Sequence, residues 1–192
     1  MTSLDEPKAL LAMAPAGPED RRLALGTAVL SLALFVIAVP FAKEPLARVD
    51  AFIPAYEAAL LITDLMTVVL LLGQYEATKS RALLVLACGY LFTGLMVIPH
   101  AMTFPGLFAP TGLLGAGPRS TAWIYMFWHS GFPIFVLGFA LLKDRDDESA
   151  AIYVPGANTM GQVVAVLGVV CLIVFMLAWV ATTGKGMLPS IM

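Results

Sequence analysis

Four ionisable side chains stand inside long apolar stretches of this chain, and they are the residues best suited to chemistry. Glu57 and Asp64 lie seven residues apart in one stretch, and His100 and His129, the only two histidines, lie in the next two. An ionisable group inside a membrane-length segment is costly and therefore marks a candidate functional site. Such groups can relay protons or bind a polar ligand, and histidine can also hold heme iron, copper or zinc.

Helical geometry predicts which of these groups can meet. At 100° per residue, Glu57 and Asp64 fall within about 20° of one helix face. A rise of about 1.5 Å per residue places Glu57 and His100 at about the same depth, roughly 5–8 Å below the outer boundary, with His129 at about 13 Å and Asp64 at about 18 Å. We therefore expect a ligand pocket in the outer half of the membrane.

An aromatic group surrounds the second histidine. Trp123, Tyr125 and Trp128 flank His129, and we include all three among the predicted ligand-binding residues. Trp123 and Tyr125 also fit an interfacial aromatic belt, which requires no ligand. Trp128 lies deeper and is harder to explain in that way.

Two prolines and one loop would shape the pocket. Pro99 and Pro133 each remove a helix hydrogen bond next to a histidine region, and we expect each to kink its helix. The loop 104–120 is apolar and rich in Gly and Pro. We expect it to fold as a lid on the outer mouth or to form a short re-entrant segment.

Each of these functional interpretations has an alternative. For Glu57 and Asp64, a proton or cation relay competes with plain interhelical hydrogen bonding. For His100 and His129, heme, copper or zinc ligation competes with hydrogen bonds to neighbouring helices or a ligand pocket without metal. Their different depths would require a tilted or kinked helix to bring both onto one iron.

The elements that must position these residues are membrane-spanning helices. The 192 residues are 60% hydrophobic and 12% charged, with a mean hydropathy of +0.89, a balance that excludes a soluble globular domain. No stretch alternates with the period of a barrel strand, so we predict an all-α transmembrane bundle in the lipid bilayer. The five predicted spans are 23–42, 51–73, 82–103, 121–142 and 161–183.

The distribution of basic residues favours a cytoplasmic N-terminus, which leaves the end of a five-span chain outside. The segments then inside carry Lys8, Arg21, Arg22, Lys79, Arg81, Lys143 and Arg145, and those outside carry Lys43, Arg48, Arg119 and Lys185. We expect residues 1–20 to form a flexible cytoplasmic tail, because they are small, acidic and Pro-containing. The net charge of −2 argues against a nucleic-acid partner.

The stretch from Gly89 to Pro133 carries a family resemblance. It reads GYLFTGLMVIPHAMTFPGLFAPTGLLGAGPRSTAWIYMFWHSGFP and resembles the bacterial membrane-associated sensor domain of the fourth class, with the resemblance covering about residues 23–183. His100, in PHAMTFPG, and His129, in YMFWHSGFP, match the motifs of that family. The resemblance implies a non-enzymatic sensory input module over residues 21–192 in the bacterial inner membrane.

The resemblance also implies partners. Members of the family feed a cytoplasmic diguanylate cyclase or histidine kinase, which implies cyclic di-GMP or two-component signalling and a homodimer. They have about eight spans, so we expect this five-span chain to be a fragment, or else a short form that signals through a partner protein. Two other functions stay open from the residues: a redox protein holding heme or quinone, and a small proton-coupled carrier using Glu57 and Asp64.

Overall fold

The computed structural model of the protein describes residues 17–44, 49, 51–149, 159–184 and 188–189. The chain divides into two units, Met1–Val49 and Asp50–Met192. The predicted all-α membrane architecture is confirmed: five helices are long and apolar enough to cross a membrane, and every regular element in the described ranges is helical. They are α1 (Pro18–Ala38), extended by the 3-10 turn η1 (Val39–Phe41), α2 (Phe52–Thr78), α3 (Arg81–Thr103), α4 (Ser120–Ser149) and α5 (Thr159–Thr183).

The first helix begins within the segment predicted to be a tail. Pro18 occupies the first turn, and the Gly17 N–H donates to the Asp20 carboxylate over 2.8 Å. A proline in the first turn and acidic side chains beside the unpaired N–H groups both favour a helix start. The predicted tail is therefore shorter by residues 18–20, and its residues 1–16 lie outside the described ranges.

A tight turn joins α2 to α3. Lys79 ends α2 in the left-handed conformation, with φ of 57°, and its N–H donates to the Tyr75 carbonyl over 2.7 Å. Ser80 then caps α3 by accepting a hydrogen bond from the Leu83 N–H over 3.3 Å. So short a connection makes the two helices antiparallel neighbours.

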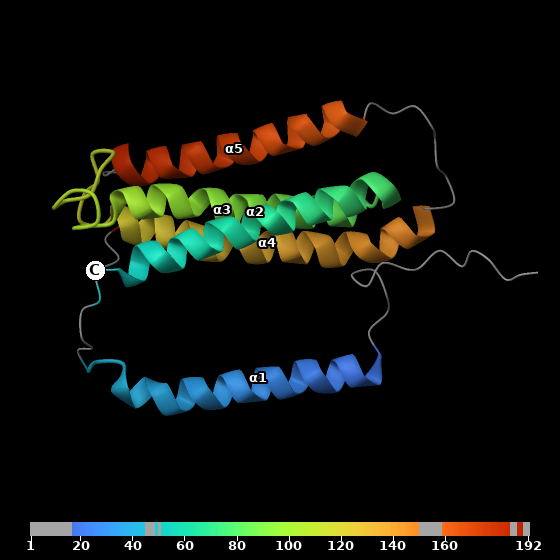
Figure 1. Ribbon diagram of the computed structural model, residues 1–192, viewed down its shortest axis with the longest axis horizontal. Helices are drawn as coiled ribbons and strands as arrows, with labels where there is room; N and C mark the ends of the chain where they lie inside the picture. The colour runs from blue at the N-terminus through green and yellow to red at the C-terminus, as the bar shows by residue number, and fades with distance from the viewer. Residues whose placement is uncertain (1–16, 45–48, 50, 150–158, 185–187, 190–192) are drawn as a thin grey trace, which may run out of the picture. The chain divides into compact units, whose positions relative to one another are not determined.

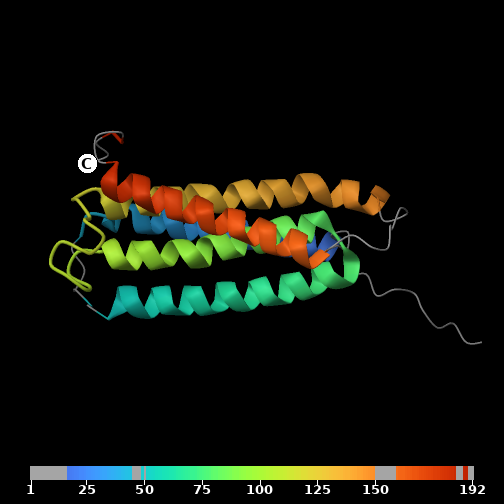
Figure 2. The same cartoon turned by 90° about the horizontal axis from the view of Figure 1, so that it is seen from above.

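The third helix is the centre of the second unit. It packs against α2, α4 and α5, and Figure 2 shows it between α2 and α4, with α5 passing in front of α3 and α4. Glycines permit its close approach to α4. A Cβ on Gly131 would lie 2.4 Å from the Phe92 ring, and a Cβ on Gly89 would lie 2.7 Å from Phe135.

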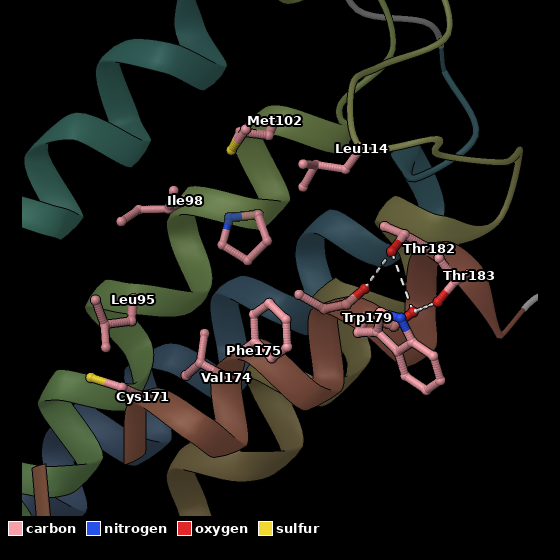
Figure 3. Close-up of a pocket in the computed structure, with 12 residues that line it drawn as sticks. Leu95, Ile98, Met102, Leu114, Cys171, Val174, Phe175, Trp179, Thr182 and Thr183 are labelled. Atoms are coloured by element: carbon pink, nitrogen blue, oxygen red, sulfur yellow. Dashed lines mark hydrogen bonds between the residues drawn. The ribbon is translucent and has the colours of Figure 1, made fainter. Parts of the chain in front are cut away.

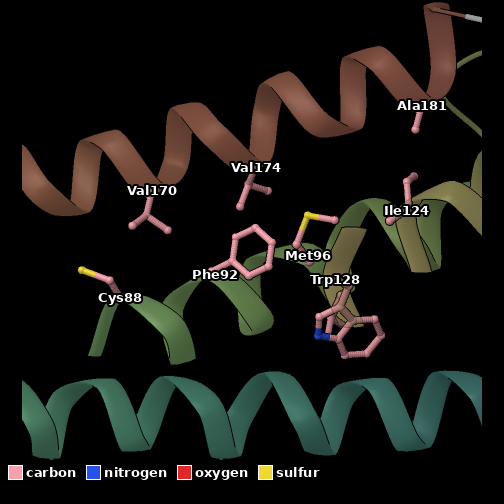
Figure 4. Close-up of a cluster of buried hydrophobic side chains, with 9 residues drawn as sticks. Cys88, Phe92, Met96, Ile124, Trp128, Val170, Val174 and Ala181 are labelled. Carbon is pink, nitrogen blue, oxygen red and sulfur yellow. The ribbon is translucent and has the colours of Figure 1, made fainter. Parts of the chain in front are cut away.

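An apolar cluster fills the space where α3, α4 and α5 meet. Val170 and Val174 of α5 point toward Cys88 and Phe92 of α3, as Figure 4 shows. Its buried members are Cys88, Phe92, Met96, Val97, Ile124, Trp128, Val170, Val174 and Ala181. Trp128, a predicted site residue, therefore has one side in this cluster.

The loop between α3 and α4 folds onto the end of α3, beyond the helices (Figure 1). The Leu113 N–H donates to the Met102 carbonyl over 2.7 Å, and the Thr121 hydroxyl donates to the Thr103 carbonyl over 2.8 Å. Gly112 has φ of +81°, and a Cβ there would lie 2.3 Å from the Thr103 carbonyl oxygen. The loop and the start of α4 thus satisfy carbonyls that the end of α3 leaves open.

Candidate functional site

A buried polar contact joins α2 to α3. His100 Nδ1 is hydrogen-bonded to Oε1 of Glu57, and the two residues are only 8% and 3% exposed. The second carboxylate oxygen of Glu57, Oε2, is also buried and has no hydrogen-bond partner among the described residues. A buried acceptor without a partner is costly, so this atom is ready to accept a proton or a hydrogen bond.

A second polar contact lies one heptad away. The Thr93 hydroxyl lies 2.7 Å from Oδ2 of Asp64. From Glu57 to Asp64 the chain advances seven residues, while from His100 to Thr93 it returns by seven, as antiparallel helices require. Gly94 permits the contact, because a Cβ there would already lie 3.3 Å from the Cβ of Asp64. We call the two contacts the polar rungs of the α2–α3 interface.

Aromatic side chains of α4 lie against both histidines. The Trp128 ring is 5.7 Å from the His100 ring and 4.8 Å from the His129 ring, measured between centroids. Tyr125 stacks on His129 at 3.8 Å and lies 6.2 Å from His100. Trp128 is therefore a direct contact between the Glu57–His100 rung and His129.

The hydrogen bond of His129 fixes which of its nitrogens can accept. Nδ1 lies 2.9 Å from the Tyr125 carbonyl oxygen, which can only accept, so Nδ1 carries the proton. The neutral ring then presents Nε2 as an acceptor. Among the residues that the structure describes, no three His, Cys, Asp or Glu side chains are grouped to hold a metal ion.

An open cavity of about 300 Å³ lies between α2, α3 and α4. We call it the Asp64 cavity, after its one carboxylate. Its lining residues are Tyr56, Leu60, Asp64, Tyr90, Thr93, Trp128, His129, Phe132 and Pro133. The loop 104–119 contributes no residue to this lining.

The structure brings together only some of the predicted pocket residues. Asp64, Trp128 and His129 line the Asp64 cavity, whereas Glu57 and His100 form the neighbouring rung and Tyr125 covers both histidines. Trp123 stands apart, because its indole N–H donates to the Pro189 carbonyl over 3.2 Å.

Sequence reasoning missed several residues of this lining. Tyr90, Thr93 and Phe132 were not among the predicted site residues, yet all three line the Asp64 cavity. Tyr90 and Phe132 meet edge to face at 5.3 Å. The seven-residue spacing of Thr93 and His100, which copies that of Asp64 and Glu57, was the signal available for Thr93.

A second, larger pocket of about 510 Å³ lies between α3 and α5 (Figure 3). Its wall is almost wholly apolar and includes Leu95, Met102, Phe175 and Trp179. Leu114 of the loop also lines it. None of the predicted site residues lines this pocket.

This arrangement defines a class of protein: a polytopic helical membrane protein with a polar, aromatic-lined site between three helices. The family model described as a membrane-associated sensor, integral membrane domain (MASE4), matches residues 47–191. The chain therefore belongs to this family of membrane sensor domains, which confirms the resemblance carried by the histidine motifs. No curated protein and no solved structure matches the chain.

Proposed function

We propose that this chain is a sensory input module of the bacterial inner membrane, with a cytoplasmic N-terminus. It relays its signal to a cytoplasmic diguanylate cyclase or histidine kinase, in the same polypeptide or in a partner protein. It works as a homodimer, because such output enzymes act in pairs. The family supports the sensory role.

The observation that carries this proposal is the buried Glu57–His100 rung with its open Oε2 atom. A signal acts on a protein only if it stabilises one conformation over another. A proton or ligand group added at Oε2 would change the charge of Glu57 and its buried hydrogen bond to His100. The rung is therefore the element whose state a signal can alter.

The contacts of Trp128 give this change a route. Its ring touches both His100 and His129, and the same residue belongs to the apolar cluster shared with α5. A shift of His100 in its rung would displace an indole packed against two further helices. We infer that binding or protonation at the site moves α2 relative to α3, α4 and α5, and that this motion reaches the cytoplasmic ends.

The test uses the gene product as the bacterium makes it, in its own membranes. The readouts are cellular cyclic di-GMP for a cyclase output and autophosphorylation in isolated membranes for a kinase output. We expect Glu57→Gln, His100→Ala and His129→Ala to change the basal output while membrane insertion is retained. A change of about 1.4 kcal/mol in the balance of two signalling states corresponds to about tenfold in their ratio.

The matched control is Glu76→Gln, which makes the same chemical change at an exposed position of α2. It should leave both outputs at the wild-type level. If all four variants accumulate in the membrane and give wild-type output in both assays, the site does not control signalling. If the histidine variants fail to accumulate, the histidines are packing residues and the proposal is also wrong.

A further inference from the structure

The Asp64 cavity has a lining suited to one kind of ligand. Its polar groups are one carboxylate, one imidazole, one indole N–H and three hydroxyls, and its described lining contains no lysine or arginine. We propose that it binds an aliphatic amine, which takes up a proton and is held as an alkylammonium ion against the carboxylate. This deepens the proposed sensory function by giving its site a ligand class, but binding itself can be measured without any output.

The hydrogen bonds around Asp64 supply the first argument for an amine ligand. The Thr93 hydroxyl lies 2.7 Å from Oδ2 of Asp64 and 2.9 Å from the Tyr90 carbonyl oxygen. It has only one proton for these two acceptors. Both contacts are satisfied together when Asp64 is protonated, because Asp64 then donates to Thr93 and Thr93 donates to the carbonyl. This pair of contacts thus suits an uncharged Asp64.

Entry of the ligand follows from that uncharged state. A neutral amine can cross the hydrocarbon region, whereas an isolated charge there is costly. In the cavity the proton on Oδ2 moves to the amine nitrogen, which leaves a carboxylate and an ammonium ion side by side. No net charge enters the membrane, and the product is a charge-assisted hydrogen bond.

The remaining lining matches the bound ammonium. Nδ1 of His129 donates to the Tyr125 carbonyl, so in the neutral form of this cavity-lining ring the remaining nitrogen, Nε2, is an acceptor. Tyr56, Tyr90 and Trp128 add aromatic faces, which attract cations. Acceptors, π-faces and a carboxylate all select a positively charged donor.

The experiment measures binding to the whole chain in lipid nanodiscs. The chain has three tryptophans. Trp123→Phe and Trp179→Phe together leave only Trp128, in the cavity wall, to report binding by tryptophan fluorescence. The probe is n-hexylamine, and 1-hexanol is its neutral counterpart of similar length. We expect hexylamine to change the Trp128 fluorescence saturably and hexanol to cause no saturable change. Equal saturation by the two compounds, or no saturation by hexylamine, would overturn the proposal.

Two variants and one control locate the binding. Asp64→Asn should raise the apparent dissociation constant for hexylamine about tenfold or more, and Glu76→Gln should leave it unchanged. Tyr56→Leu, at a half-exposed position that carries little packing, should weaken binding to a smaller extent. If neither Asp64→Asn nor Tyr56→Leu weakens binding, the amine sits elsewhere and the proposal fails. Because no output is measured, these results stand whether or not the sensory function is upheld.

Discussion

The α2–α3 interface and the α3–α4 interface are held together by different kinds of contact. Toward α2 the contact is polar, with the Glu57–His100 rung and the Asp64–Thr93 rung. Toward α4 it is mainly apolar and interlocked, with the Phe92 ring seated against Gly131 and one hydrogen bond, from the Thr121 hydroxyl to the Thr103 carbonyl, at the loop end. The α2 interface therefore depends more on side-chain hydrogen bonds, and the α4 interface depends more on close fit.

In a membrane this difference decides which neighbour can move. Lipid tails are as apolar as leucine, so the α3–α4 contact gains little from burial and depends on close fit. An interlocked fit has few alternative arrangements. Hydrogen bonds of the α2 interface can instead be exchanged for bonds to a proton or a ligand. Under the proposed function, this difference makes α2 the responsive element and α3, α4 and α5 its support.

The largest expected effect breaks the fitted interface. Gly131→Ala places a methyl group 2.4 Å from the Phe92 ring and should destabilise the bundle by about 1–3 kcal/mol. Gly73→Ala is the control, because a Cβ there meets nothing within 4 Å. Unfolding of both variants in mixed micelles by added denaturing detergent measures the difference. Equal stability of the two variants would contradict an interlocked α3–α4 contact.

A double-mutant cycle sharpens the comparison at the first rung. Glu57→Leu and His100→Leu, made singly and together, should show a coupling energy of about 1–2 kcal/mol in the same unfolding assay. This coupling energy lies at the upper end for membrane proteins, because the hydrogen bond is buried and joins ionisable groups. Additive effects of the two substitutions would mean that the rung contributes nothing to holding α2.

The smallest effect is expected at the second rung. Thr93→Val removes the hydroxyl beside Asp64 and should cost about 0.6 kcal/mol, the usual value for an interhelical hydrogen bond in lipid. Thr67→Val makes the same change where the hydroxyl donates within its own helix, to the Thr63 carbonyl over 2.8 Å, and should be close to neutral. A larger loss of stability for Thr67→Val than for Thr93→Val would mean that the second rung does not stabilise the α2–α3 interface.

Much of this fold could be predicted from the sequence because membrane physics constrains it strongly. Apolar runs of spanning length must be helices, and all five proved helical. The rise per residue also placed Glu57 and His100 at one depth, and the structure joins them by a hydrogen bond.

The rest depended on helix register and helix faces. The partner of Asp64 could not be chosen without knowing how α2 and α3 are aligned, which the turn at Lys79 sets: each rung's two residues are nearly equidistant from it in the chain. Trp123 lies apart from the Asp64 cavity because its indole contacts Pro189, a residue far along the chain. The estimated depth gap between Asp64 and His129 assumed straight, parallel helices, yet both line one cavity.

The central claim, that α2 responds while α3, α4 and α5 form its support, can be measured directly as distances between spin labels in lipid nanodiscs. After replacement of Cys88 and Cys171, labels at exposed Val69 and Leu137 report the α2–α4 distance, and labels at Leu137 and Leu172 report α4–α5.

The account predicts that Glu57→Gln shifts or broadens the α2–α4 distance distribution and leaves the α4–α5 distribution unchanged. An unchanged α2–α4 distribution, or equal changes in both pairs, would contradict it.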